Sequence, residues 1–209
     1  MFPNKTQDNI LFHLKMNGSQ TAQALATTFS MTGEGMRLHL IKLEEEGYVT
    51  SSAMVKGVGR PTLHYALTEK SHKRFPDNHA NLAVQLLTNI RNLLGQEALD
   101  TVIKAKQKTD YLRYTEVLKN APTTQEKLER LADTRTREGY MAELQPMDNG
   151  WLFIENHCPI CTAATACNGF CQSEIDTIRR LLGEKITVNR DDHAAHGERR
   201  CTYRIHAAE

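Results

Sequence analysis

The sequence lacks two features that would assign a chain to a class at once: a long apolar run and an excess of one charge. No stretch approaches the roughly 18 consecutive apolar residues of a membrane-spanning helix. The first residues, MFPNKTQDNILFHLKMNG, have no unbroken apolar segment of the kind found in signal peptides. Lys and Arg together number 26, against 25 for Asp and Glu. We therefore expect a cytoplasmic protein without a membrane partner, and its net charge gives no indication of a polyanionic ligand.

Motifs of the common enzyme classes are also missing. The sequence has no nucleophile elbow, no P-loop and no Rossmann fingerprint, and its GEG and GVG tripeptides are typical of turns. We therefore expect no enzymatic activity. The chain has 209 residues and an ordinary apolar fraction of 40%, which is enough for two modest domains with cores of their own.

Residues 1–75 carry the pattern of three helices followed by a β-hairpin. Ser19 and Thr32 are placed to cap the second and third helices, and the turn-rich KGVGRPT separates the two strands. The predicted elements are helices over 6–17, 19–28 and 32–47 and strands at 48–50 and 63–67. This order is that of a winged helix-turn-helix, which we interpret as a DNA-binding domain.

The third helix of this pattern would lie in the major groove, and the hairpin would form the wing. Residues 1–75 hold nine Lys or Arg and six acidic residues, a small excess that favours a polyanion. Arg37 is suited either to guanine or to phosphate, and a cation at a hairpin tip suits phosphate or a narrow minor groove. The candidate DNA contacts are Thr32, Gly35, Arg37, His39, Lys42, Lys56 and Arg60.

The stretch TAQALATTFSMTGEGMRLHLIKLEEEGYVTS, followed by GRPTLHYALT, resembles the winged-helix regulators related to the ArsR and DeoR families. The resemblance implies a double-stranded DNA operator as the partner. Glu34 and Gly35 depart from the small hydroxylated and polar residues usual in that helix, so the resemblance does not extend to a base preference.

Beyond Pro76 the pattern is helical, and then it becomes mixed. Residues 77–119 place apolar residues on repeating helical faces, which is typical of a homodimer seam but also of packing within one chain. Thr123 and Glu126 form a capping box for a helix to Glu138. Thereafter a hairpin signal at Asp148-Asn149-Gly150, an amphipathic helix and two final strands indicate an α+β domain. We therefore divide the chain into a winged helix-turn-helix (1–75), long dimerisation helices (76–121) and a cysteine-rich α+β sensor domain (122–209).

Four of the five cysteines fall in HCPICTAATACNGFC, residues 157–171, and the fifth is Cys201. In the cytoplasm such a cluster is more typical of metal binding or redox chemistry than of structural disulfides, and the odd number also disfavours complete pairing. Structural zinc sites usually have two C-x2-C pairs. Here the second pair has a gap of three, and an iron–sulfur cluster tolerates such irregular spacing better. The candidate ligands are four of Cys158, Cys161, Cys167, Cys171 and Cys201, with His157, His193 and His196 as alternate ligands, outer neighbours or simple loop residues.

A second resemblance covers most of the chain. The pattern NHCP, a cysteine twelve residues later followed by Gln-Ser-Glu, a helix, a strand and CTYRI is similar to that of SufR-type regulators. These are winged-helix dimers that sense iron–sulfur status. The resemblance implies a [4Fe–4S] cluster held by Cys158, Cys171 and Cys201, with Cys161 or Cys167 as the fourth ligand. It leaves the signal open between nitric oxide, peroxide and iron.

Two other interpretations of the cysteines keep the same DNA-binding domain. One is a repressor that binds zinc or copper, and the other is a metal-free switch in which Cys161 or Cys167 forms reversible disulfides. The direction of regulation, as activator or repressor, does not follow from the sequence.

Overall fold

The computed structural model describes residues 5–54 and 61–207, and it divides into two compact units, 1–77 and 78–209. Each unit is described by itself. No helix of the described ranges combines the length and the apolar character needed to cross a membrane.

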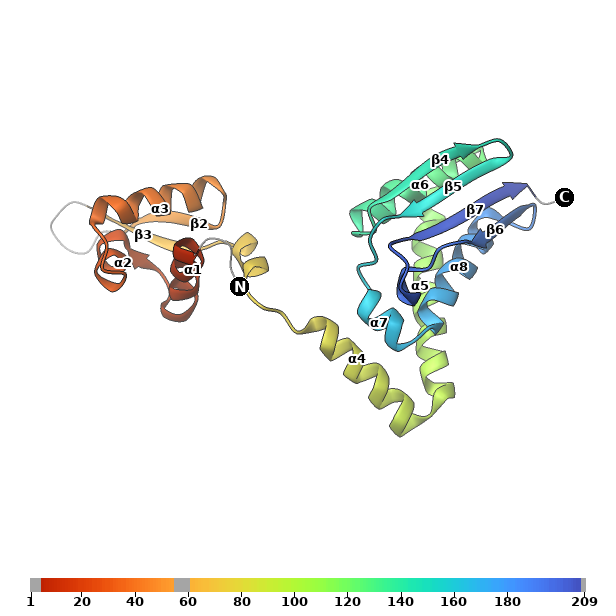
Figure 1. Cartoon of the computed structure of the whole chain (residues 1–209), viewed down its shortest axis with the longest axis horizontal. Helices are drawn as coiled ribbons and strands as arrows, with labels where there is room; N and C mark the ends of the chain where they lie inside the picture. Colours follow the sequence, from red (N-terminus) through yellow and green to blue (C-terminus); the bar gives the residue numbers. More distant parts are fainter. Residues whose placement is uncertain (1–4, 55–60, 208–209) are drawn as a thin grey trace. The chain divides into compact units, whose positions relative to one another are not determined.

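The first unit is a winged helix (Figure 1). Its three-stranded antiparallel sheet has the order β1-β3-β2, so β2 and β3 form the wing and β1 pairs on the outer side of β3. Its elements are α1 (Lys5–Asn17), β1 (Gln20–Thr21), α2 (Ala22–Thr28), α3 (Gly33–Glu45), β2 (Val49–Met54), β3 (Thr62–Leu67) and the 3-10 helix η1 (Glu69–Arg74). The predicted order of three helices and a hairpin is confirmed.

Local capping explains the boundaries of the helices in this unit. The Thr32 hydroxyl accepts a hydrogen bond from the Gly35 amide at 3.1 Å and so begins α3, as predicted. The prediction for α2 is wrong by two residues, because Thr21 rather than Ser19 is its N-cap and accepts from the Ala24 amide. The chain leaves α3 through Gly47, whose φ of +73° is unfavourable for residues with a side chain.

The second unit is a two-layer α+β structure (Figure 1). Its antiparallel sheet has the order β4-β5-β7-β6, and α5, α6 and α8 pack on one face of it around Leu128, Phe153 and Tyr203. Its elements are α4 (His79–Asn89), the π-helical turn η2 (Ile90–Leu94), α5 (Gln96–Leu118), α6 (Thr124–Arg137), β4 (Ala142–Met147), β5 (Gly150–Glu155), α7 (Cys161–Ala166), α8 (Gly169–Leu182), β6 (Ile186–Arg190), the 3-10 turn η3 (Ala194–His196) and β7 (Cys201–Ala207).

Two features of this unit differ from the sequence pattern. The helical run predicted over 77–119 is interrupted at Gly95, whose φ of +88° and ψ of 170° end η2 and begin α5. The cysteine segment, for which the sequence pattern indicated no helix, contains the short helix α7. The Thr123 cap of α6 and the hairpin at Asp148-Asn149 are confirmed.

Candidate functional site

Helix α3 presents its candidate DNA contacts around the side that faces away from the core. Met36, Leu40 and Leu43 are buried against the other helices, whereas Thr32, Arg37 and Lys42 are exposed. Gly35 and His39 are half-buried. The Arg37 guanidinium lies 3.4 Å from the Glu34 carboxylate, and both side chains are well exposed. An exposed pair of this kind holds Arg37 only weakly, so it remains available to a ligand.

Sequence reasoning missed two apolar residues on the outward side of α3. Leu38 and Ile41 are 62% and 48% exposed, whereas Met36, Leu40 and Leu43 of the same helix are buried in the core. The signal was present, because both positions fall on the face opposite Met36, Leu40 and Leu43. Exposed apolar side chains on such a helix can contact thymine methyl groups in the major groove.

The N-terminal end of α3 lies beside the base of the wing. Arg37 lines a hollow of about 520 Å³ together with residues from the start of α2 and from β3. The lining residues are Thr21, Ala22, Gln23, Arg37, Pro61, Thr62, Leu63 and Tyr65. The predicted wing contacts Lys56 and Arg60 lie outside the described residues.

The cysteines of the second unit come from four neighbouring elements. Cys158 follows β5, Cys161 begins α7, Cys171 is in the first turn of α8 and Cys201 begins β7. Cys171 and Cys201 are buried, whereas Cys158 and Cys161 are half-buried, and all are free thiols. The fold therefore brings Cys201 to the 158–171 segment across thirty residues of chain.

These four thiols lie within one another's electrostatic field. Burial raises the pKa of Cys158 from 9.0 to about 12, and charge on Cys161 and Cys201 adds to the increase. Burial likewise raises the pKa of Cys171 to about 11, with Cys201 and Cys161 again contributing. The pKa of Cys201 is also raised by burial. Neutral thiols are thus favoured until a metal displaces their protons.

Cys167 stands apart from this group. It is partly buried against the apolar cluster of Leu99, Ile103 and Phe170, where Leu87 and Ile90 of α4 and η2 also pack. It is not among the main charges acting on Cys158, Cys171 or Cys201. Its surroundings are those of a small apolar residue in a core.

Three polar side chains border the four thiols. Glu174 acts on the pKa values of Cys158, Cys171 and Cys201. Arg190 donates to the Cys171 carbonyl oxygen at 2.6 Å. His193 precedes Ala194, whose amide donates to the Cys201 sulfur at 3.4 Å. The rings of His193 and His196 lie at a tilt to each other, with their centroids 4.0 Å apart. Burial, followed by Arg190 and His196, lowers the pKa of His193, which keeps the imidazole neutral.

Beneath the thiols lies a buried ion network that the sequence did not reveal. Arg135 of α6 donates through Nε to Glu155 at 2.6 Å and through Nη2 to Glu174 at 3.1 Å, and its guanidinium stacks on Tyr140 at 3.3 Å. Its Nη1 donates to the Tyr114 hydroxyl at 3.1 Å. Glu155 immediately precedes the cysteine segment and Glu174 lies three residues after Cys171. The network therefore fixes both flanks of that segment.

The spacing of the candidate ligands limits the kind of metal group that they could hold. In the described residues, no three His, Cys, Asp or Glu side chains converge closely enough to hold one ion. An iron–sulfur cluster needs less convergence, because each thiolate binds a different iron. Two buried nitrogen atoms next to the thiols, Arg190 Nε and His193 Nε2, find no hydrogen-bond partner within the described chain. Soft sulfur donors and unpaired nitrogens at one place fit an iron–sulfur cluster.

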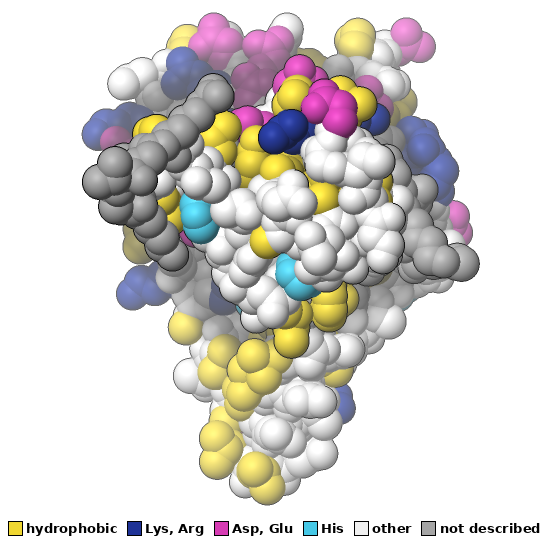
Figure 2. Space-filling model, turned by 90° about the vertical axis from the view of Figure 1, so that its left-hand side faces the viewer, with side chains coloured by type: hydrophobic (Ala, Val, Ile, Leu, Met, Phe, Trp, Pro, Cys, Tyr) yellow, Lys and Arg dark blue, Asp and Glu magenta, His cyan; other side chains and the backbone are white. Residues whose placement is uncertain are grey.

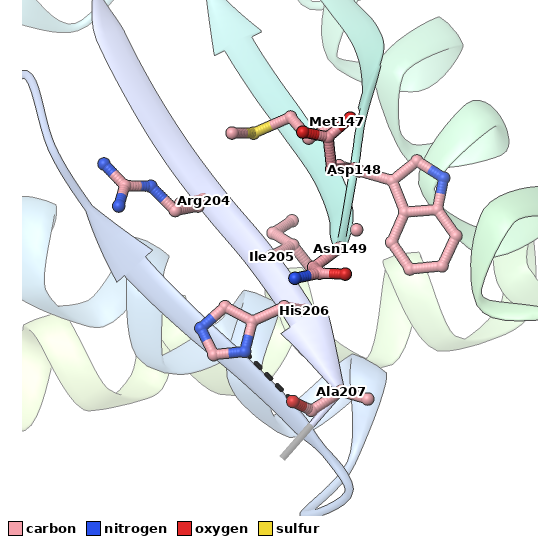
Figure 3. A pocket seen from close by; sticks show the side chains of 9 residues that line it. Met147, Asp148, Asn149, Arg204, Ile205, His206 and Ala207 are labelled. Atoms are coloured by element: carbon pink, nitrogen blue, oxygen red, sulfur yellow. Dashed lines mark hydrogen bonds between the residues drawn. The ribbon is translucent and has the colours of Figure 1, made fainter. Parts of the chain in front are cut away.

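A second hollow, of about 770 Å³, lies at the other end of the β5–β7 pair (Figure 3). It is lined by the β4–β5 turn and by the end of β7, and Arg204 and His206 point to the same side of that strand. Arg204 is paired with Asp191 at 2.8 Å. The hollow contains no cysteine and none of the predicted site residues.

The comparisons with known proteins give only distant likenesses. No protein-family model matches the chain, and no curated protein matches it. Among solved structures, the chain is similar to Bacillus subtilis PadR in complex with operator DNA, with 14% identity and a TM-score of 0.32 over 66% of this chain and 95% of that one. It is also similar to smu.1604c from Streptococcus mutans UA159, with 18% identity and a TM-score of 0.28 over 85% of this chain and 95% of that one.

Proposed function

We propose that this chain is a DNA-binding transcriptional regulator, not an enzyme, and that its first unit binds operator DNA. The observation that carries the proposal is the exposed face of α3 on a winged-helix scaffold. The N-terminal turn of α3, with Thr32 and Arg37, enters the major groove, and the wing contacts the adjacent backbone. Arg37 binds guanine or phosphate, while Leu38 and Ile41 supply apolar contacts to thymine methyl groups.

A second copy of the chain is the natural partner of an unusually apolar surface on the second unit. Figure 2 shows hydrophobic side chains gathered at the lower end of the view, over α4 and η2. Leu82, Leu86, Leu93 and Leu94 are each at least half exposed. A homodimer through this surface presents two α3 helices to two half-sites of an operator. We expect Leu86→Glu with Leu93→Glu to give a monomer in sedimentation, whereas Leu38→Glu on α3 leaves the dimer intact.

The second unit is proposed to be the sensor, holding an iron–sulfur cluster of the [4Fe–4S] type. Cys158, Cys171 and Cys201 would be ligands, and the grouping of charges favours Cys161 over Cys167 as the fourth. Such a cluster supplies a redox-active group that oxidants, nitric oxide or iron shortage remove. Zinc is the second candidate, because tetrahedral thiolate sites suit that ion, but the thiols would have to move closer together than they lie among the described residues.

The contacts of the cysteine segment connect the proposed metal site to α4, the helix that follows the first unit in the chain. Ile160 and Cys167 pack with Leu87 and Ile90 around the buried cluster of Leu99, Ile103 and Phe170, and α7 contacts α4. Helix α4 directly follows the first unit in the chain and carries the apolar surface assigned to dimerisation. A change in the cysteine segment therefore biases α4 and, through it, the spacing of the two α3 helices. We infer that the loaded form binds DNA and that damage to the site weakens binding.

The test combines selection of DNA with metal analysis. Anaerobically reconstituted protein is used to select duplexes from a random library, and the affinity for a selected duplex is measured with and without the bound metal. Failure to enrich any sequence would contradict the reader assignment. Equal affinity of the loaded and metal-free forms would contradict the sensor assignment alone.

A matched pair of cysteine variants tests the ligand set. Cys161→Ser should lose most of the iron and sulfide, whereas Cys167→Ser should retain them, since Cys167 packs in an apolar cluster. The opposite result would exchange the two assignments. A colourless protein with stoichiometric zinc would replace the iron–sulfur cluster with the zinc site.

A further inference from the structure

We propose that Arg190 is a positioning residue that supplies the counter-charge for a metal group held by the four thiols. The inference rests on the proposed sensor function and adds a cation to its site. Neither the sequence pattern nor the ligand spacing singles out this residue among the 26 Lys and Arg of the chain.

The guanidinium is held in place by the main chain of one ligand. Arg190 ends β6, and its Nη2 donates to the Cys171 carbonyl oxygen at 2.6 Å. The same nitrogen lies 3.4 Å from the Tyr203 hydroxyl, and the guanidinium is 5.2 Å from the centre of that ring. Arg190 is thus fixed between the start of α8 and the strand that carries Cys201.

No carboxylate balances this cation within the described ranges. The neighbouring acids are already engaged elsewhere: Asp191 with Arg204 and Asp192 with the Thr202 hydroxyl, each at 2.8 Å. The deeper acids, Glu155 and Glu174, bind Arg135. A half-buried guanidinium without a carboxylate partner is suited to holding an anion next to it.

Two thiols of the proposed site lie close enough to act on Arg190. Cys171 and Cys201 are among the main groups acting on the guanidinium, together with Tyr203. Its Nε is buried and has no acceptor in the described chain, so a fixed N–H donor is left over next to the thiols. Metal binding removes the thiol protons and makes the sulfurs negative. A thiolate or a sulfide is then the acceptor that Nε lacks.

The position of Arg190 matters because a metal group bound by the thiols would be negatively charged. Four thiolates give a metal group a net negative charge, and one more electron makes it more negative still. A nearby cation and a hydrogen bond to sulfur stabilise the bound group and favour its reduced form. Arg190 should therefore strengthen binding and raise the reduction potential.

The experiment compares three variants of the full chain after anaerobic reconstitution with iron and sulfide. Arg190→Gln removes the charge, and Arg190→Lys restores it without the planar fork. Arg179→Gln is the control, because Arg179 also donates to a backbone carbonyl, that of Val188, but is bound to Asp176 on the surface. The readouts are the reduction potential, the rate of iron loss to a chelator and the affinity for Co²⁺ alone.

We expect Arg190→Gln to lower the reduction potential, to speed iron loss and to weaken Co²⁺ binding about tenfold, which is the usual effect of removing an outer partner of a metal ligand. Arg190→Lys should recover most of the potential, and Arg179→Gln should behave as the wild type. If the wild type takes up iron and Arg190→Gln matches it in potential and in loss rate, the role of Arg190 is refuted and the sensor function stands. If the wild type binds neither iron with sulfide nor Co²⁺, the metal-sensing function and this inference both fall.

Discussion

The two units differ in how far they bury their charges. In the first unit the main buried cluster is apolar and includes Ile10, Leu25 and Met36, and a buried carboxylate, Asp8, pairs with the partly exposed Arg74. In the second unit both members of an ion pair, Arg135 and Glu155, are almost completely buried under the cysteines. Both units reach a compact fold, but the second encloses a complete ion pair in its interior.

The difference agrees with the roles proposed for the two units, DNA binding by an exposed surface and sensing by a site inside the fold. A reader of DNA needs cations that are free to meet phosphate, and an apolar core is sufficient to hold its helix. A site that takes up an anionic metal group needs fixed charges at defined places, and burial fixes them. We therefore expect substitutions of the exposed charged residues of α3 to affect binding, and substitutions in the buried network of the second unit to affect folding.

The largest expected effect is in the buried network. Arg135→Met leaves Glu155 and Glu174 without their cation and should lower the free energy of unfolding by about 3–5 kcal/mol. Trp151, the only tryptophan, lies in β5 and reports on this unit, so the change is measured as a shift of its fluorescence transition in urea. Arg204→Met, which breaks a surface pair, should shift it by less than about 1 kcal/mol. Equal shifts for the two variants would remove the contrast between the units.

The next largest effect is expected in the apolar core of the first unit. Leu40→Ala should destabilise the first unit by about 2–4 kcal/mol, because it leaves a cavity among fully buried side chains. The transition seen by far-ultraviolet circular dichroism should move, while that of Trp151 fluorescence stays in place. Leu38→Ala, two residues away on the exposed face, is the control and should change stability by less than about 0.5 kcal/mol. A shift of the Trp151 transition by Leu40→Ala would show that the units unfold together.

A smaller effect is expected on DNA binding. Arg37→Ala should weaken binding to a selected duplex by about 1–2 kcal/mol, roughly tenfold, and leave stability nearly unchanged. Fluorescence anisotropy at several salt concentrations separates a phosphate contact, which lowers the salt slope, from a base contact, which relaxes the sequence preference. Lys119→Ala removes an exposed cation of the second unit and should leave the affinity as it is. Unchanged binding by Arg37→Ala would place the DNA contact elsewhere.

The smallest effect concerns pH. Burial raises the pKa of the Cys158 thiol from 9.0 in an unfolded chain to about 12 in the folded, metal-free protein. The folded form therefore keeps its proton where the unfolded form loses it, and stability falls as the pH rises above 9. Urea unfolding of metal-free protein at pH 8 and pH 10, followed by Trp151, should show the decrease. It should be smaller in Cys158→Ser, and a decrease of the same size in that variant would assign it to other groups, such as Tyr114, whose pKa burial raises to about 12.

The sequence was sufficient to predict elements that depend on local chemistry. The Thr32 and Thr123 caps, the stop at Gly47 and the turn at Asp148-Asn149 are all set by a few neighbouring residues, and they occur where they were expected. The interruption at Gly95 was harder, because a glycine inside an apolar helical pattern is often tolerated and only its φ of +88° identifies the break.

The candidate site could be predicted only in part, for a reason of distance along the chain. The cysteines were visible as a motif, but the separation of Cys167 from the other thiols depends on α4, which lies roughly eighty residues earlier. Arg135 is one of several arginines in α6, and nothing nearby marks it as the buried one. Its partners come from β5 and α8, so only the tertiary fold brings them together.

The pairing of β5 with β7 has a consequence for how the proposed site would assemble. Glu155 and Cys201 are direct partners across these two strands, and β7 follows α8 in the chain. A nascent chain that has completed α8 displays the thiols of 158–171 but has no Cys201 at the sheet edge. A metal group held by Cys201 together with these thiols would therefore load only after β7 has paired with β5. A slip of β7 by one residue would turn Cys201 to the opposite face, so completion of the proposed site would also require that the strand has paired in register.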